Sequence, residues 1–432
     1  MRVLILAHDC NPEWASLPIV GYKASAAIAR RVECVIATHV RNEALIREKH
    51  TGPGEFAFID NEYIAAPMYR LAQRLRGGNA VAWTTNIAMA YPAYLAFERE
   101  VWKRFGADLR AGRFDLVHRV TPMSPTLPSW IAKRCPVPFV LGPLNGGLRW
   151  PAAYREELRS EKEWLSYLRR AHRLLPYYAS TYRSARAILG AFTHTIEDLP
   201  VGCRSRAIDF PEVGIDPALF AASPEGEARS PDVLFAGRLV PYKCPDVIVQ
   251  AFSASESLRR RRLLIVGDGP ERPRLEAMIR EHGLAGCVEL LGWRSQAEVG
   301  RLMRRCSVFA FPSIRELGAG AVVEAMGCGL ACVVVDYGGP GGLVGIDRGV
   351  KVPLAPKPAL VESFAREVAG LLDEPERAAR LGSAAREFVR SEYTWDAKAE
   401  KTLEVYRWVL GQEPSRPTFI RSAPQPGREA AA

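Results

Sequence analysis

The amino-acid sequence predicts an α/β protein of two domains, each a doubly wound parallel sheet covered by helices. A chain of 432 residues is long for a single hydrophobic core. In both halves, short runs rich in Val, Ile and Leu alternate with segments of helical period. Residues 212–232 are rich in Pro, Gly, Ser and acids, which is typical of a linker. The predicted domains are 1–215 and 216–393, followed by a helix over 394–411 that returns to the first domain and a disordered tail over 412–432.

Each predicted strand is a short apolar run bounded by turn residues. The first domain is expected to contain strands 2–7, 34–39, 56–60, 114–120, 138–144 and 186–192, and the second domain strands 232–237, 263–267, 287–292, 307–313 and 330–336. Helices are expected between them. Pro245 and Asp246 suit the first turn of one helix, and Ser295 with Glu298 makes a capping box for another that runs to about Arg305. Because open α/β sheets bind ligands beyond the carboxyl ends of their strands, functional residues are expected just after strands, in a cleft between the sheets.

Composition excludes several classes of protein. With 48% hydrophobic and 25% charged residues, the chain is an ordinary globular sequence rather than a disordered one. The first apolar run is too short for a signal peptide, and no later stretch reaches the ~20 apolar residues of a spanning helix, so a cytoplasmic location is expected. The nine cysteines are scattered, without a Cys-x-x-Cys pair or zinc-ligand spacing. We interpret them as small buried residues.

Positive charge is concentrated in the first half. Residues 101–186 hold 16 basic and 6 acidic residues, which favours an anionic partner. Within them, apolar and aromatic residues alternate with arginines, as in a helix that lies on an anionic membrane. These positions are Trp164, Leu165, Tyr167, Leu168, Arg169, Arg170, Arg173, Leu174 and Tyr177. Peripheral membrane binding at the inner leaflet is therefore one hypothesis. The alternative is that the apolar positions pack into the first domain.

Two cations follow the first strand of the second domain. Gly237, Arg238 and Lys243 lie in a predicted strand-to-helix loop, where the cations could hold a diphosphate and stabilise the charge that grows as it leaves. The alternative is two surface cations. After the next strands come Gly267, in a turn that lets backbone approach a ligand closely, and Trp293 with Arg294, which could border a nucleobase. A partly buried structural tryptophan is the alternative there.

Residues 315–329 combine acids and glycines in an apolar run. Glu316 lies in a loop after a buried strand, and Gly318 and Gly320 open a short helix that ends at Gly327 or Gly329. Uncovered backbone N–H groups at this helix N-terminus would suit a phosphate. Glu324 lies deeper in the helix and needs partners, because an unpaired buried acid costs several kcal/mol. Ribose hydroxyls would serve for Glu324 and sugar hydroxyls for Glu316, with an ion pair to an arginine as the alternative for Glu324.

Two common nucleotide-binding motifs are missing from the sequence. No G-x-G-x-x-G follows the first strand, so a nicotinamide enzyme is disfavoured. No G-x-x-x-x-G-K-[ST] occurs, so a P-loop nucleotidase is disfavoured as well.

Taken in order, the motifs resemble family 4 of the retaining glycosyltransferases, which have the two-domain GT-B fold. The matching stretches are "VGYKASAAIAR", "FDLVH", "FPEVGIDPALF", "GRLVPYK", "VGDGPE", "LLGW", "FPS" and the pair Glu316 and Glu324 followed by "AMGCG". The resemblance implies transfer of a hexose from a UDP- or GDP-sugar to a hydroxyl of a glycan or lipid-linked acceptor. The expected pathway is the synthesis of cell-surface polysaccharide or glycolipid. The resemblance implies no metal, no cofactor and no nucleic-acid partner.

The resemblance also implies roles for single residues. Arg238 and Lys243 would hold the diphosphate, Glu324 the ribose and Glu316 the donor sugar. The backbone near Gly318 and Ala319 would hold the phosphate and the sugar, and Gly21 would approach the diphosphate from the first domain. Arg238, Lys243 and Glu316 would act in catalysis. His118 would also be catalytic and would contact the acceptor, but Val120 stands where the family often has a second histidine, so a satisfied strand-end histidine is the alternative. Asn145 is a candidate contact to donor or acceptor.

Two other functions remain open at this point. A sugar-nucleotide epimerase of GT-B architecture is one, although such an enzyme should carry further acids and histidines for elimination chemistry. A non-catalytic sugar-nucleotide-binding protein is the other, and it would bind donor without turnover.

Overall fold

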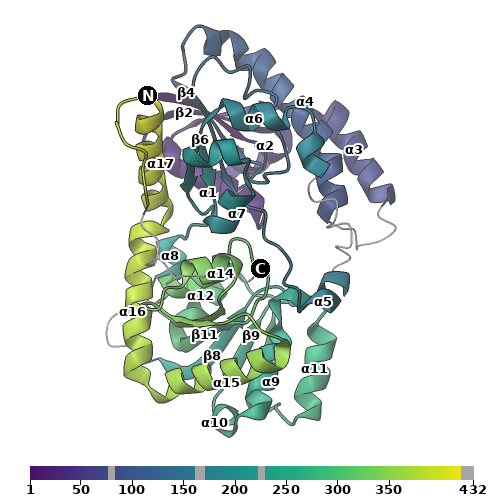
Figure 1. Cartoon of the computed structure of the whole chain (residues 1–432), viewed down its shortest axis with the longest axis vertical. Coiled ribbons are helices and arrows are strands. Elements are labelled where there is room, and N and C mark those ends of the chain that lie inside the picture. The colour runs from purple at the N-terminus through teal and green to yellow at the C-terminus, as the bar shows by residue number, and fades with distance from the viewer. Residues whose placement is uncertain (76–82, 161–170, 222–228, 420–432) are drawn as a thin grey trace. The chain divides into compact units, whose positions relative to one another are not determined.

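The structure, a computed structural model, describes residues 1–75, 83–160, 171–221 and 229–419 and divides into two compact units (Figure 1). The first unit comprises residues 1–149, 155–214 and 395–419. Among the described residues, the second comprises 150–154 and 215–394. Each unit contains one parallel sheet, as the alternation of apolar runs and helical segments predicts.

The first unit has a seven-stranded sheet in the order β3-β2-β1-β4-β5-β6-β7. Its strands are β1 (Arg2–Ala7), β2 (Glu33–His39), β3 (Glu55–Ile59), β4 (Leu116–Thr121), β5 (Phe139–Leu144), β6 (Ala185–Gly190) and β7 (Ala207–Asp209). Its helices are α1 (Leu17–Ala29), α2 (Glu43–Lys49), α3 (Glu62–Leu75), α4 (Trp83–Arg110), α5 (Arg155–Ser160), α6 (Tyr178–Ser184), α7 (Phe192–Asp198) and α17 (Trp395–Val409).

The two faces of this sheet bury separate apolar clusters, because successive strand residues point to opposite faces. Leu4 and Leu6 of β1 belong to the cluster that α4 covers with Phe97. Val3 and Ile5 belong to the cluster on the other face, which also contains residues of α1 and α17. The helix at 395–409 thus completes the core of the first unit, although it follows the second unit in the sequence.

The second unit has a six-stranded sheet in the order β10-β9-β8-β11-β12-β13. Its strands are β8 (Ser230–Ala236), β9 (Leu263–Val266), β10 (Val288–Gly292), β11 (Cys306–Phe311), β12 (Ala331–Val335) and β13 (Val350–Val352). Its helices are α8 (Pro217–Phe220), α9 (Pro245–Ala254), α10 (Glu256–Arg259), α11 (Arg272–Glu281), α12 (Gln296–Arg305), α13 (Gly320–Gly327), α14 (Gly338–Leu343), α15 (Lys357–Asp373) and α16 (Pro375–Glu392).

Local helix signals in the second unit act as predicted. Pro245 and Asp246 occupy the first turn of α9. The Ser295 and Glu298 side chains form the capping box of α12, which ends at Arg305. The nine cysteines are free thiols and are buried or partly buried, in agreement with their interpretation as packing residues.

The chain end differs from the prediction. Residues 412–419, which we expected to be disordered, lie against the first unit. The Arg416 side chain donates hydrogen bonds to the carbonyls of Ser205 and Ala207, at 2.7 and 3.2 Å. The Phe419 ring contacts the Phe210 ring at 5.9 Å between centroids. One arginine and one aromatic ring therefore fix a segment that its composition alone marks as disordered.

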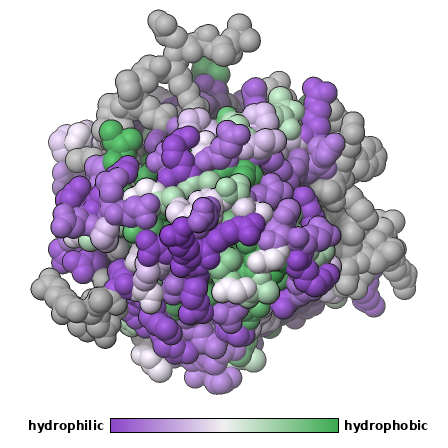
Figure 2. All heavy atoms as spheres, turned by 90° about the horizontal axis from the view of Figure 1, so that it is seen from below, coloured by the Kyte–Doolittle hydropathy of each residue, from purple (hydrophilic) through white to green (hydrophobic). Residues whose placement is uncertain are grey.

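The surface of the second unit near α10 and α15 is mainly hydrophilic, with apolar side chains in small separate areas (Figure 2). Among the helices that the structure describes, none combines the length and the apolar character needed to cross a membrane.

Candidate functional site

In the second unit, backbone contacts hold together the loops that follow β8, β9 and β10. The amide of Gly267 donates to the carbonyl of Gly292 at 2.9 Å. A Cβ on Gly267 would lie 1.9 Å from the Gly237 oxygen, and a Cβ on Gly269 would lie 2.4 Å from the Leu239 oxygen. Only glycine permits these approaches, and Gly267 also has a positive φ of 136°. In this structure, the glycines of the turn serve loop-to-loop packing.

Lys243 and Glu316 meet at the carboxyl ends of the neighbouring strands β8 and β11. The Lys243 Nζ lies 2.5 Å from the Glu316 Oε2, and the two side chains are only 10% and 19% exposed. The ammonium also lies 4.9 Å from the centre of the Phe311 ring. The strand order reverses between β8 and β11, which is the point where doubly wound sheets bind ligands. The two residues that the sequence analysis assigned to diphosphate and sugar therefore form one ion pair at that point.

Tyr242 connects this ion pair to residues that the sequence did not identify. Its hydroxyl accepts a hydrogen bond of 3.0 Å from the exposed Arg238 guanidinium. Its ring lies edge-on to the Trp150 ring at 6.5 Å. The Arg315 guanidinium lies over the Trp150 ring at 4.9 Å. Residues 150–154 belong to the second unit although most of the neighbouring sequence belongs to the first, and no sequence motif indicates this.

The loop after β11 presents backbone to the site. Ala319 adopts a left-handed conformation (φ 54°) and precedes α13, whose first turn receives no side-chain cap. The N–H groups that follow Gly318 and Ala319 therefore lie at an uncapped helix N-terminus that starts at Gly320, the arrangement predicted for phosphate binding. Gly339 fixes this loop from the far side, because its amide donates to the Glu316 carbonyl at 2.8 Å.

Glu324 lies on α13 between the buried residues Val323 and Ala325 and is itself half-buried. This agrees with the prediction of an acid in apolar surroundings. Beyond β10, Trp293 is 74% exposed, so it is mostly open to solvent rather than the partly buried structural tryptophan given as the alternative. Arg294 is exposed beside it and donates to the Trp293 carbonyl at 3.2 Å. Trp293 thus offers an open aromatic face next to the β8–β10 loops.

Two predicted site residues of the first unit have structural surroundings instead. Gly21 lies within α1 rather than in a loop, and a Cβ there would lie 2.2 Å from the Asp9 oxygen, so it serves close helix packing. His118 is 1% exposed, and its ring nitrogens lie 2.6 Å from the Tyr406 hydroxyl and 2.6 Å from the Gly142 carbonyl oxygen. Burial lowers the pKa of His118 to about 4. This is the paired structural histidine that the sequence analysis gave as the alternative.

Asn145 also lies in the first unit and is 9% exposed. Its amide nitrogen donates to the Glu212 carboxylate, and its backbone amide donates to the Met123 carbonyl at 2.8 Å. Its side-chain oxygen is buried and makes no hydrogen bond within the part of the chain that the structure describes. Asn145 therefore joins β5 to the chain segment after β7, and this contact occupies its side-chain donor group.

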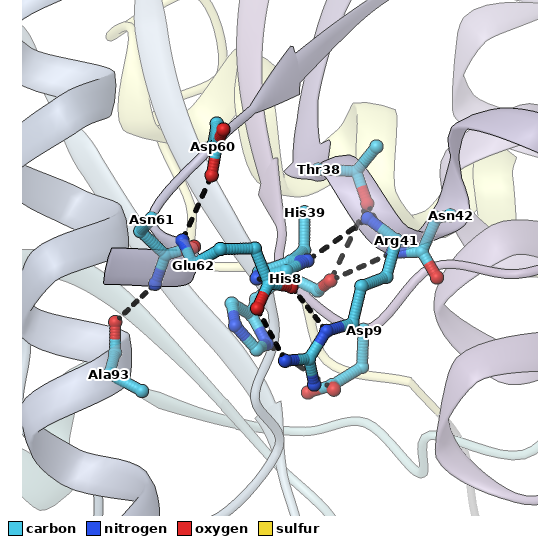
Figure 3. Close-up of polar contacts among 10 residues, drawn as sticks. All are labelled: His8, Asp9, Thr38, His39, Arg41, Asn42, Asp60, Asn61, Glu62 and Ala93. Atoms are coloured by element: carbon cyan, nitrogen blue, oxygen red, sulfur yellow. Dashed lines mark hydrogen bonds and ion pairs between the residues drawn. The ribbon is translucent and has the colours of Figure 1, made fainter. Parts of the chain in front are cut away.

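A polar cluster at the carboxyl ends of β1, β2 and β3 escaped the sequence analysis (Figure 3). The His8 Nδ1 lies 3.3 Å from the Asp9 Oδ1, and the His8 and His39 rings meet edge to face at 5.3 Å. The His39 Nε2 lies 3.7 Å from the Glu62 Oε1, and Arg41 binds the same carboxylate through two nitrogens. Their positions at or after the ends of predicted strands could have indicated these residues, but they belong to no recognised sequence motif.

Comparison with known proteins identifies the second unit. Residues 221–388 match the family described as glycosyl transferases group 1. A 2-deoxystreptamine glucosyltransferase of Streptomyces kanamyceticus is 31% identical over 233 residues, which cover 51% of this chain and 59% of that protein. A GDP-mannose-dependent alpha-(1-6)-phosphatidylinositol monomannoside mannosyltransferase of Mycobacterium tuberculosis is 31% identical over 219 residues, which cover 46% of this chain and 56% of that protein. The chain thus spans less than two thirds of the length of these curated relatives.

A solved structure extends the likeness of fold to both units. Sucrose-phosphate synthase from Thermosynechococcus elongatus matches 95% of this chain and 100% of its own, with a TM-score of 0.63 and 17% identity. Both sheets of this chain also follow the 3-2-1-4-5-6 order of Rossmann folds. Residues 221–388 are therefore similar to the glycosyl transferases group 1 family, in a chain with the two-domain GT-B fold.

Proposed function

We propose that this protein transfers a hexose, with retention of configuration, from a UDP- or GDP-sugar to a hydroxyl of a glycan or lipid-linked acceptor. One observation carries the proposal: the Lys243–Glu316 pair lies at the strand-order reversal of a glycosyl transferases group 1 domain, next to an uncapped helix N-terminus. A cation, an acid and free backbone N–H groups are what a departing diphosphate and a hydroxyl-rich sugar need.

In this proposal, each group has one task. Lys243 and Arg238 neutralise the diphosphate as the bond to the sugar breaks, together with the N–H groups at the start of α13. Glu316 accepts hydrogen bonds from the donor sugar, and Glu324 accepts them from the ribose. The acceptor hydroxyl attacks from the side on which the diphosphate leaves and gives its proton to the departing phosphate oxygen. No enzyme nucleophile is then required.

The same cations make a metal ion unnecessary in the proposed reaction. Lys243 and Arg238 supply the positive charge that a divalent ion supplies elsewhere. The proposal therefore expects turnover in the presence of excess EDTA.

The open tryptophan next to the β8–β10 loops suits the nucleobase. Trp293 is 74% exposed, and an aromatic face can stack on either uracil or guanine. The relatives leave the choice of base open, because only one of the two named above states its donor.

We also propose that the chain works at the inner face of a membrane, through residues 101–186. Of the positions that suggested this, Arg173 pairs with Asp198 at 2.9 Å, Leu174 is 88% exposed and Tyr177 is partly exposed. The positions Trp164, Leu165, Tyr167, Leu168, Arg169 and Arg170 lie outside the described residues.

Donor binding and turnover together test the proposed transferase function. Calorimetric titration with UDP, GDP and their hexose conjugates should show binding of one pair, weakened in Glu324→Ala. Lys243→Ala should keep most donor affinity and lose on the order of a hundredfold or more in turnover, because the charge on the leaving phosphate goes unmatched. Asp373→Ala, an exposed acid on α15, is the control. Wild-type behaviour of both site variants would falsify the assignment, and tight donor binding without any turnover would favour a sugar-nucleotide-binding protein.

A further inference from the structure

The polar cluster of the first unit, defined as His8, Asp9, His39, Arg41 and Glu62, lies where this sheet is expected to receive a ligand. Asp9 follows β1 and Thr121 ends β4, and the strand order reverses between these two strands. The Thr121 hydroxyl accepts a hydrogen bond of 3.0 Å from the Asp9 amide and lies 3.1 Å from the Asp9 carbonyl oxygen. The Asp9 backbone is thus fixed at the reversal point, in the loop after β1, as Lys243 lies in the loop after β8 of the second unit.

Hydrogen bonds and ring packing hold the cluster in place, and part of it is exposed to solvent. Asn42 donates to the Thr38 hydroxyl at 2.9 Å and to the His8 carbonyl at 3.1 Å, which ties the end of β2 to the loop after β1. The His8 ring packs edge-on against the rings of Tyr94 and Phe97 at 5.9 and 5.0 Å. Its Nε2 is buried and makes no hydrogen bond to any residue the structure describes. Yet a third of the Asp9 side chain is exposed. These are the features of a prepared binding surface.

The charges of the cluster select the chemistry of that ligand. Burial opposes ionisation of Asp9, but the neighbouring His8 outweighs it and leaves the pKa of the carboxyl below its ordinary value. The hydrogen bond from Arg41 lowers the pKa of Glu62. Burial lowers the pKa of His39 to about 4, so this imidazole is neutral at physiological pH. The cluster contains two carboxylates, Asp9 and Glu62, but one guanidinium, Arg41, which Glu62 already binds through two nitrogens.

We propose that this cluster binds the acceptor, and that the acceptor presents an unphosphorylated sugar or cyclitol ring here, with a ring hydroxyl that donates a hydrogen bond to Asp9. An ionised carboxylate accepts strong hydrogen bonds from hydroxyl groups. A phosphate in the same place would meet two carboxylates beside a single guanidinium and be repelled. The inference rests on the proposed transferase function, which supplies the need for an acceptor. The proposed acceptor site differs from that of a transferase that binds a phosphate group of the acceptor.

Binding of matched probes to the full chain tests the inference without knowledge of the natural acceptor. The probes are two pairs: myo-inositol with myo-inositol 1-phosphate, and methyl α-mannoside with mannose 6-phosphate. Ligand-observed NMR titrations at about pH 8, where carboxylates are ionised, give the dissociation constants. We expect at least one unphosphorylated probe to bind about tenfold or more tightly than its phosphorylated partner. Asp9→Asn should weaken that binding by about tenfold. It should also reduce the difference between the dissociation constants of the two probes in that pair.

Two further variants keep the outcome decisive. Glu62→Gln changes the charge of the cluster but leaves the Asp9 side chain in place. It should also reduce the difference between the dissociation constants of the phosphorylated and unphosphorylated probes. Glu33→Gln removes an exposed acid at the opposite end of β2. It should change neither the affinity for the unphosphorylated probe nor the difference within the probe pair. The inference is overturned if no polyol binds, if phosphorylated probes bind as well as their partners, or if Asp9→Asn and Glu62→Gln behave like Glu33→Gln. If the chain binds a nucleotide sugar but no polyol, this inference is wrong and the proposed function still stands. If the chain binds a polyol but no nucleotide, the proposed function is wrong and the polar cluster remains a polyol-binding site.

Discussion

The ion pair of Lys243 and Glu316 shows how one contact serves both stability and chemistry. Because both side chains are mostly withdrawn from water, removing either one leaves the other charge poorly solvated and lowers the free energy of unfolding. Activity of a Lys243 variant therefore has to be measured next to its thermal stability. In the absence of donor, Glu316 holds the ammonium at the carboxyl ends of β8 and β11. In the proposed reaction, the lysine is thus already in place before the diphosphate arrives, which limits the conformational entropy that binding has to remove.

Trp293 gives the first prediction for a single side chain. Its side chain is 74% exposed, so truncation removes little packing within the protein. If the ring stacks on the nucleobase, Trp293→Ala should weaken donor binding by about 1–3 kcal/mol. Turnover at saturating donor should change little, because the base is remote from the bond that breaks. Calorimetric titration and saturation kinetics measure the two effects.

Trp14→Ala is the matched control for that experiment. Trp14 is 46% exposed, but it lies in the loop after β1 of the first unit. Its truncation should leave the dissociation constant of the nucleotide unchanged. Equal nucleotide affinity of wild type and Trp293→Ala would exclude stacking on the base.

Single residues were predictable where a strand end marks them and unpredictable where contacts come from distant sequence. Lys243, Glu316 and Glu324 follow apolar strands at positions that the sequence shows directly. Trp150 could not be found in this way, because its packing against Tyr242 depends on a segment of the first half that joins the second unit. His118 was ambiguous for a similar reason, since its partner Tyr406 lies on α17.

The loops after parallel strands behave as one element in the second unit. The turn at Gly267 rests on the backbone of the loop that carries Arg238 and Lys243. Gly267→Ala should therefore disturb the site and the fold together. A Cβ 1.9 Å from the Gly237 oxygen and a φ of 136° leave no room for relaxation without backbone movement. We expect the free energy of unfolding to fall by at least about 2 kcal/mol and donor affinity to fall with it.

Gly286→Ala is the control for this backbone contact. Gly286 is exposed, and a Cβ there would meet no atom within 4 Å. Denaturant unfolding of both variants gives the comparison, and it should leave Gly286→Ala close to wild type. Similar midpoints for Gly267→Ala and wild type would mean that the two loops are not held together as the structure shows.

Regular elements followed from apolar patterning, with exceptions of one kind. Each strand that the sequence analysis expected has a counterpart in the structure, but β7 and β13 were missed. Both have three residues and lie at sheet edges, where a short run leaves no measurable period. The prediction for segment 412–419 was wrong because it rested on the low apolar content of the segment. Composition does not show single contacts, and here one arginine and one phenylalanine hold the segment against the first unit.

Charge divides the chain unequally between its halves. Residues 1–200 carry 27 Lys and Arg against 18 Asp and Glu, whereas residues 201–432 carry 31 against 30. The proposed donor site lies in the nearly neutral half, so the excess is not needed to bind nucleotide. In the first half, the polar cluster that we propose as the acceptor site holds two carboxylates and one guanidinium. The excess of positive charge therefore lies outside both proposed sites and is available for an anionic surface.

The last prediction concerns that surface. If residues 101–186 meet an anionic leaflet, the full chain should co-sediment with vesicles that contain phosphatidylglycerol, and binding should weaken as salt rises. Each cation near such a surface contributes about 1 kcal/mol, and screening shortens the reach of the attraction to about 8 Å at physiological ionic strength. Binding should therefore fall steeply between low and physiological salt.

Vesicles of phosphatidylcholine alone separate charge from apolar insertion. Replacement of Arg169, Arg170 and Arg173 by glutamine should reduce binding to anionic vesicles, while replacement of Arg259, Arg260 and Arg262 in the second unit, which removes the same charge, should not. Equal loss in the two triple variants would mean that net charge alone governs the attraction. Binding that persists on neutral vesicles would instead assign the contact to exposed apolar side chains such as Leu174, which is 88% exposed. A chain that stays in the supernatant with anionic vesicles at low salt has no membrane contact through this segment.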